Sequence, residues 1–305
     1  MFSSSQKHTP KPGILSVSAA AILWGTVGIA TQTIYRQSDL TAVAVGFYRL
    51  ALALPIVGFL CWRIVGKQIF QITNRQLGKM ALIGVMLAIY QVCFFASISQ
   101  VGVAIATLIT LCSAPVLVSL ISVVILGEKL TGYTLIALLA ALLGTILLVG
   151  LPEETTIQNN IALGVALALG SATGYAIVVL MGRTIAANCH PILSTTVSFG
   201  VGAIFLFPLA AGTIFTASYN FEIWELIVYV GLVPTAVAYT LFFFGMRSIK
   251  ASSASILTML EPLTATILAW IIFDEHFAPA GFIGALLLLG AMMILYQGEK
   301  SAKVQ

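Results

Sequence analysis

The stretch SASILTMLEPLTATILAWIIFDEH, residues 253–276, is a long apolar run with one acid, Glu261, in its middle. Pro262 follows this acid directly. If the run crosses a lipid bilayer, Glu261 lies near the midplane, where a carboxylate is costly and usually has a function. An earlier stretch, CSAPVLVSLISVVILGEK at residues 112–129, has a proline and a glutamate at the same spacing, but no acid before the proline. The chain therefore contains two similar segments, and only one of them carries an acid in the middle of its apolar run.

The two stretches belong to a longer internal repeat. From Gly84 onward, identical residues recur at a constant offset of 147 positions, without a gap. The scarce residues are the informative ones: Pro115 recurs as Pro262, and Glu128 recurs as Glu275. The polar connection LPEETTIQNN, residues 151–160, lies between the copies. We therefore predict two equivalent units, residues 1–150 and 151–305.

The composition predicts an all-α integral membrane protein. Of 305 residues, 60% are apolar and 8% are charged, whereas about a quarter of the residues in soluble domains are charged. About 20 apolar residues in a helix cross the hydrocarbon core. The first apolar run, from Ile14 to Ile34, is too long for a signal peptide, and we expect it to be the first span. The ten predicted transmembrane helices are 14–35, 40–62, 77–98, 103–126, 132–150, 161–182, 192–214, 224–245, 251–273 and 279–297.

The distribution of basic residues predicts the orientation. If the N-terminus is cytoplasmic, twelve lysines and arginines lie inside, Arg36 alone lies outside, and Arg49 lies within a span. Such a bias predicts a multi-pass protein of the cell membrane, inner or plasma, with both termini cytoplasmic. Five spans per unit is an odd number, so the second unit enters the membrane inverted. Inverted repeats are typical of secondary transporters, whose sites lie near midplane at the repeat interface.

Two charges lie at depth in the predicted spans, Glu261 and Arg49. Glu261 either binds a proton or a cationic group, or is a neutral structural acid, because a low dielectric disfavours its charged form. Arg49 either binds an anionic group or an acid, or ties backbone carbonyls together. The two residues have opposite sign and lie in opposite units. Their pairing is a hypothesis that the spacing does not decide.

Four aromatic residues inside spans are further candidates for substrate binding or coupling: Trp24, Tyr90, Tyr175 and Tyr239. Each combines apolar surface with a polar atom, although packing is the alternative interpretation for each one. Trp24 and Tyr175 hold corresponding places in the first span of each unit.

Small residues near these two aromatics predict close helix packing. The residues are Gly25, Gly28, Gly170 and Gly174.

Pro115 and Pro262 are candidate hinges. A proline inside a helix removes one hydrogen bond and leaves free the carbonyl four residues earlier, here those of Leu111 and Thr258. The pair predicts either kinks with open carbonyls facing a cavity, or ordinary kinks of membrane helices.

Motifs for catalysis are not found in the sequence. The three histidines lie outside the predicted spans, and no HExxH, GxSxG or phosphate-binding GxxxxGK[ST] pattern occurs. The four cysteines show no metal-ligand spacing. We therefore expect no enzyme activity, catalytic residue, metal or cofactor. We also expect no nucleic-acid partner, because the basic residues flank the membrane.

Short motifs recur at fixed places in the spans: Trp24-Gly25, Phe47-Tyr48-Arg49-Leu50, Ala114-Pro115, Gly127-Glu128-Lys129, Leu260-Glu261-Pro262 and Asp274-Glu275. With ten spans and the repeat, they make the chain resemble the EamA family of the drug/metabolite transporter superfamily. The resemblance implies a central cavity lined by the first four helices of each unit. It also implies that the last helices lie outside the cavity, in a position to form a homodimer contact.

The function implied by this resemblance is secondary active transport of a small molecule across the bilayer by alternating access. We expect an exporter of amino acids or other small metabolites. A multidrug efflux transporter is the alternative within this class. A passive channel or facilitator is the alternative outside it.

Overall fold

The computed structural model describes residues 10–150, 160–186, 189–216, 220–273 and 279–301. Regular secondary structure in these ranges is helical throughout, and ten segments are long and apolar enough to cross a membrane. The prediction of ten spans is confirmed, with ends that agree to within about four residues. The observed spans are 11–37, 42–65, 74–101, 105–126, 132–149, 161–186, 191–214, 221–245, 251–272 and 279–301.

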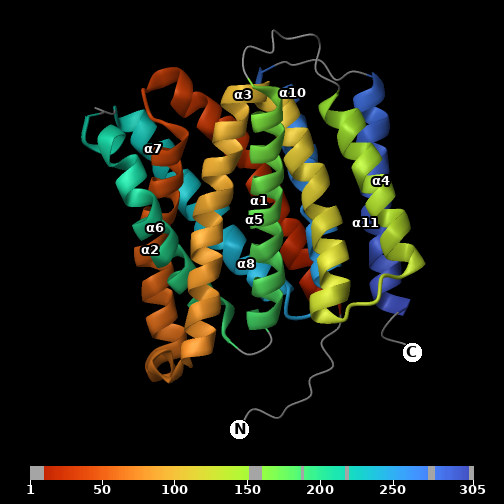
Figure 1. Cartoon of the computed structure of the whole chain (residues 1–305), viewed down its shortest axis with the longest axis horizontal. Helices are drawn as coiled ribbons and strands as arrows, with labels where there is room; N and C mark the ends of the chain where they lie inside the picture. The colour runs from red at the N-terminus through yellow and green to blue at the C-terminus, as the bar shows by residue number, and fades with distance from the viewer. Residues whose placement is uncertain (1–9, 151–159, 187–188, 217–219, 274–278, 302–305) are drawn as a thin grey trace.

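The first unit contains four α-helices and a short 3₁₀ turn. One of the helices, α3, contains two spans. Its 53 residues would measure about 80 Å if straight, well beyond the thickness of a bilayer. Figure 1 shows it as two columns, orange and then yellow, that meet at one end of the molecule. The bounds are α1 Pro10–Gln37, α2 Ala42–Val65, η1 Gly66–Gln71, α3 Asn74–Leu126 and α4 Gly132–Val149.

The second unit has the same number of spans but more interruptions. Its eighth span is built from α7, the π-helix η2 and α8, and its ninth span is divided into α9 and α10. The bounds are α5 Ile161–Ala186, α6 Pro191–Thr216, α7 Phe221–Gly231, η2 Leu232–Val237, α8 Ala238–Gly245, α9 Ala251–Leu257, α10 Leu260–Phe273 and α11 Pro279–Ser301.

Helix ends follow from capping residues in the connections. The hydroxyls of Thr41, Thr73 and Thr131 accept hydrogen bonds from the first turns of α2, α3 and α4. These bonds satisfy amide groups that have no partner within the helix. At the other end of α3, Gly127 has φ 64°, a left-handed conformation that glycine adopts without strain.

The two units interlock as inverted repeats. The first span of each unit packs on the third and fourth spans of the other: α1 contacts α8 and α10, whereas α5 contacts both parts of α3. The second spans, α2 and α6, contact each other, as do the last, α4 and α11. Figure 1 shows α4 and α11 together at one side of the bundle. The predicted position of the last helices, outside the centre, agrees with this packing.

One repeated glycine illustrates the symmetry. A Cβ on Gly84 would collide with the carbonyl of Ser198 on α6, and one on Gly231 would lie 3.0 Å from Leu52 Cβ on α2. Each glycine thus lets the third span of its own unit approach the second span of the other. The match found in the sequence therefore corresponds to equivalent contacts in space.

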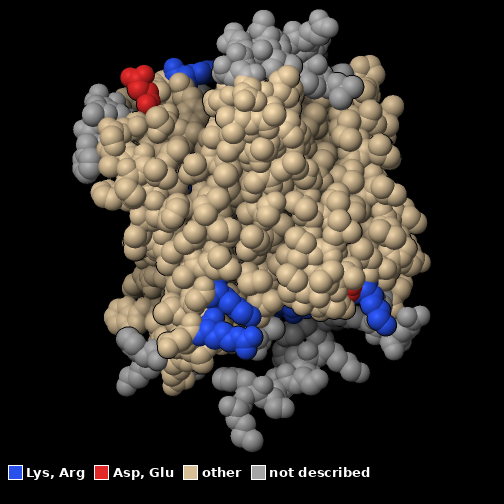
Figure 2. Space-filling model, in the orientation of Figure 1, with Lys and Arg blue, Asp and Glu red and all other residues tan. Residues whose placement is uncertain are grey.

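Both ends of the described chain lie on one face of the bundle, where α1 begins and α11 ends (Figure 1). Basic side chains gather on that face, as Figure 2 shows. Lys250 Nζ donates to Lys129 O at 3.0 Å, and Lys79 Nζ on α3 donates to Thr184 Oγ1 on α5 at 3.4 Å, so segments that are distant in the sequence meet there. We call this the terminal face. Some residues named above lie outside the described ranges: Asp274, Glu275, His276 and residues 151–159 of the polar connection between the two units.

Candidate functional site

The six residues predicted for binding or coupling come from six different helices. Trp24 lies on α1, Arg49 on α2, Tyr90 on α3, Tyr175 on α5, Tyr239 on α8 and Glu261 on α10. Ring contacts, hydrogen bonds and electrostatic interactions join all of them into one cluster. We call these six residues the central cluster. Both units contribute three of its members.

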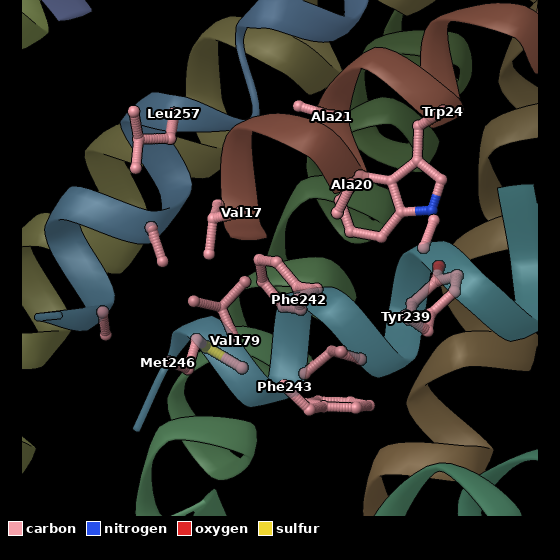
Figure 3. Close-up of a cluster of buried hydrophobic side chains, with 14 of the residues drawn as sticks. Val17, Ala20, Ala21, Trp24, Val179, Tyr239, Phe242, Phe243, Met246 and Leu257 are labelled. Atoms are coloured by element: carbon pink, nitrogen blue, oxygen red, sulfur yellow. The ribbon is translucent and has the colours of Figure 1, made fainter. Parts of the chain in front are cut away.

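The aromatic part of the central cluster is a continuous chain of contacts. The Trp24 and Tyr239 rings lie 4.9 Å apart between centroids, and the Tyr90 and Tyr175 rings lie 5.9 Å apart, edge to face. A hydrogen bond of 2.9 Å between the hydroxyls of Tyr90 and Tyr239 connects the two pairs. Trp24 is 5% exposed and Tyr239 is 3% exposed. Figure 3 shows Trp24 beside Tyr239, with Phe242 next to both.

Arg49 is held by one hydrogen bond. Its Nε donates to Thr235 Oγ1 at 3.1 Å, and the Thr235 hydroxyl donates to Val230 O at 2.7 Å. Thr235 lies in the π-helix η2, a type of irregularity that is frequent at functional sites. The guanidinium interacts electrostatically with Tyr90, Tyr239 and Glu261. The cation therefore faces the aromatic residues and the acid.

Glu261 lies deep among the helices but is only half-buried. Within the described residues, its carboxylate makes no hydrogen bond and no ion pair, and the hypothesis of a contact pair with Arg49 is not met in this conformation. Its electrostatic neighbours are Arg49, Tyr90 and Tyr175. The carboxylate thus has no partner among the described residues, although a cation is nearby.

The backbone at Glu261 corrects the prediction of an open carbonyl. The Glu261 N–H donates to Thr258 O at 3.0 Å, so the carbonyl that Pro262 leaves without its usual partner is satisfied by the preceding residue. The helix is interrupted at Thr258 and Met259, just before this bond. At Pro115, in contrast, α3 continues without interruption. The two prolines therefore differ in local structure, and their role as hinges stays a prediction.

Two of the four predicted glycines make close contacts. A Cβ on Gly25 would lie 2.8 Å from Glu261 O, so this glycine lets α1 approach the backbone of the acid. A Cβ on Gly174 would lie 3.0 Å from Tyr90 Cβ. Gly170 has only an ordinary contact, with Cys93, and Gly28 has open space. The prediction of close packing is right for the two glycines at the central cluster and wrong for the other two.

Two buried polar atoms near the cluster have no hydrogen-bond partner among the described residues: Trp24 Nε1 and Gln91 Oε1. Buried polar groups are normally satisfied, so such atoms indicate places where a ligand or water binds. Gln91 and Thr235 were not predicted. A polar residue inside an apolar span was the available signal for both. No group of three or more metal-ligating residues occurs in the described ranges.

Comparison with known proteins identifies the family. The model of the EamA-like transporter family matches residues 11–150 and again residues 162–297. The chain is 29% identical to the uncharacterized transporter YwfM of Bacillus subtilis, over 92% of each chain. It is 28% identical to the uncharacterized inner membrane transporter YicL of Salmonella typhimurium, over 93% of this chain and 95% of that one.

A solved crystal structure has the same fold, with a TM-score of 0.77 at 19% identity, over 92% of this chain and 95% of the other. The two family matches follow the two interlocked units, and both curated relatives carry the name of transporters. The chain therefore belongs to the EamA-like transporter family and is a multi-pass membrane transporter.

Proposed function

We propose that the protein is a secondary active transporter that exports amino acids or similar small zwitterions by alternating access. The main support is that Arg49 and Glu261 belong to one cluster but form no hydrogen bond or ion pair with each other. A zwitterion offers a carboxylate to the first and an ammonium group to the second. The aromatic side chains of the central cluster offer apolar surface for the rest of the cargo.

Coupling to protons follows from the chemistry of Glu261. A carboxylate deep in a membrane stays charged only beside a cation, and otherwise it holds a proton. The ammonium group of the cargo is such a cation, so its binding would release the proton. Exchange of proton for cargo at one carboxylate is a simple way to drive export. The inverted repeat supports this proposal, because transporters of that architecture alternate around a site between the repeats.

The location is part of the proposal. We place the protein in the cell membrane, with the terminal face in the cytoplasm, because basic residues gather on that face. A homodimer through the last helices stays a prediction. The exposed apolar side chains of α4 and α11, such as Leu139 and Leu286, fit lipid as well as a second copy.

The test is transport by the purified protein in proteoliposomes, across a series of pH values, with a panel of labelled amino acids. Gln keeps the shape and hydrogen bonding of Glu261 but cannot titrate. Glu261→Gln should therefore abolish the pH dependence of transport, while the exposed acid Glu225 supplies a control, Glu225→Gln, that keeps it.

Other outcomes would favour the alternatives. Equal pH profiles in the parent and Glu261→Gln would assign Glu261 to structure. Transport of chemically unrelated cationic drugs, without transport of amino acids, would favour multidrug efflux. Flux that neither saturates nor depends on the proton gradient would favour a channel or facilitator.

A further inference from the structure

We infer that Thr235 is a positioning residue that holds the Arg49 guanidinium away from Glu261, so that both charges stay available to the cargo. The benefit to transport rests on the function proposed above. The positioning itself is a property of the protein without cargo, and it is testable without transport.

The hydroxyl of Thr235 is oriented by its own helix. A hydroxyl has one proton and two lone pairs, and this proton goes to Val230 O, five residues earlier, at 2.7 Å. That spacing matches the widened turn of the π-helix. The lone pairs of Oγ1 are therefore left to accept the Nε–H of Arg49, at 3.1 Å. Thr235 is fully buried, so no solvent competes for this position.

Anchoring Nε fixes the direction of the cation. The guanidinium is planar and its donors form a rigid fork. When Nε is bonded to Thr235, the two terminal nitrogens point away from it. No hydrogen bond or ion pair of these nitrogens with another described residue is present. They are thus left in the arrangement that binds a carboxylate with two parallel hydrogen bonds.

Without this anchor, the nearest strong attraction for Arg49 is Glu261. Opposite charges attract strongly where water is scarce, and the carboxylate has no hydrogen-bond or ion-pair partner among the described residues. A direct pair would consume both charges, and cargo would have to break it before binding. Thr235 therefore offers the guanidinium a neutral partner that leaves the acid vacant.

Few other titratable groups act on Glu261. Arg49 reaches it from α2, Tyr90 from α3 and Tyr175 from α5. The main helix contacts of α10 are with α1, α4 and α11, and none of the described residues of these three helices has a titratable group that interacts with this acid. A change in Arg49 is therefore the main route by which a substitution at Thr235 can alter the protonation of Glu261.

The experiment measures the protonation of Glu261 by infrared difference spectroscopy in the absence of cargo, with Glu261→Gln to assign the carboxyl band. Thr235→Val keeps the shape of the side chain and removes the hydroxyl. Collapse of Arg49 onto Glu261 would favour the carboxylate, so the protonation midpoint should fall by about one pH unit, a tenfold loss of proton affinity. Thr235→Ser keeps the hydroxyl and should keep the parental midpoint.

Two further variants separate positioning from a general effect on the helix. Thr240 lies in α8, three residues beyond the end of the π-helix at Val237, and its hydroxyl donates to Ala236 O at 2.7 Å. No hydrogen bond joins it to Arg49 among the described residues. Thr240→Val should therefore leave the midpoint unchanged. In an Arg49→Gln background, Thr235→Val should have no further effect, because the cation that it releases is absent.

An unchanged midpoint in Thr235→Val would overturn the inference, and so would an equal shift in Thr240→Val. A shift that persists in the Arg49→Gln background would also overturn it. If the midpoint shifts as expected but the parent moves no amino acid, the positioning stands and the proposed function fails.

Discussion

The carboxylate of Glu128 joins the end of α3 to the start of α9, and its removal is a sharp test of the packing at the terminal face. Glu128 Oε1 accepts from Ala251 N at 2.8 Å. Its Oε2 accepts from Ser252 N at 3.3 Å and from Ser252 Oγ at 3.0 Å. The N-cap residue of α9, Lys250, makes no capping bond with its own side chain. Glu128, which lies just after the end of α3, therefore caps the N-terminus of α9 in place of the side chain of Lys250.

The expected magnitude follows from these bonds. Hydrogen bonds to a charged group contribute about 1.5–3 kcal/mol each, and loss of an N-cap alone costs about 0.5–2 kcal/mol. Glu128 is half-buried at the edge of the membrane, so water can replace part of what is lost. We expect Glu128→Ala to lower the free energy of unfolding by about 2–3 kcal/mol. Gln keeps one acceptor oxygen but not the charge, so Glu128→Gln should lose about half as much.

The assay is thermal unfolding in detergent, followed by a dye that reacts with thiols. Cys61 is buried and forms no disulfide, so it reports the opening of the helix bundle when the half-buried Cys93, Cys112 and Cys189 are replaced by serine. Glu225→Ala removes an exposed acid of α7 and serves as the matched control. If Glu128→Ala unfolds at the same temperature as Glu225→Ala, the bonds to α9 do not stabilise the fold and the reasoning fails.

Three further predictions concern movement, orientation and packing. Pro262→Ala should slow transport more than Pro115→Ala does, without an equal loss of folded protein, because only Pro262 adjoins an interrupted helix; equal parental rates would make both prolines packing features. In a background without the four native cysteines, cysteines near Glu153 should react with an impermeant reagent from outside the cell, whereas those near Arg75 should not, and the reverse pattern would refute the proposed orientation. Gly144→Leu should lower the folded yield, because even a Cβ at this glycine would lie 2.8 Å from a backbone carbonyl of α11; an unchanged yield would contradict the close crossing.

The spans and their inversion could be predicted because they depend on gross properties of the chain. Apolar length alone decides which segments cross a bilayer, and an odd number of spans per unit requires inversion. Rare residues in apolar surroundings located the repeat, and Gly84 and Gly231 then proved to make equivalent contacts in the structure.

The irregular helices could not be predicted, because they depend on individual hydrogen bonds. Proline patterns indicate which carbonyl loses its usual donor, but not which group replaces it. At Thr258 the replacement is the N–H of Glu261 itself. The π-helix required the Thr235 hydroxyl to reach Val230 O, a bond that only a widened turn allows. The sequence did indicate a difference between the units at this place. Pro234 and Thr235 in the second unit correspond to Leu87 and Ala88 in the first.

The members of the central cluster were predictable to different degrees. Charges inside apolar spans are costly, so Glu261 and Arg49 stand out in the sequence. Trp24 and Tyr175 stand out by their corresponding places. The distance between cation and acid could not be read from spacing, because it depends on how α2 and α10 are placed in the bundle and on the hydrogen bond from Arg49 to Thr235.

The local structure of the two units differs where their packing is the same. The π-helix at 232–237 and the interruption at 258–259 correspond to residues 85–90 and 111–112, where α3 is regular. Both irregularities adjoin the charges of the central cluster, since one anchors Arg49 and the other precedes Glu261. A regular helix must break backbone hydrogen bonds before it can bend sharply, whereas a widened or interrupted helix can exchange its hydrogen bonds at little cost. The second unit is therefore where we expect conformational change to begin, with α3 as the rigid part against which it moves.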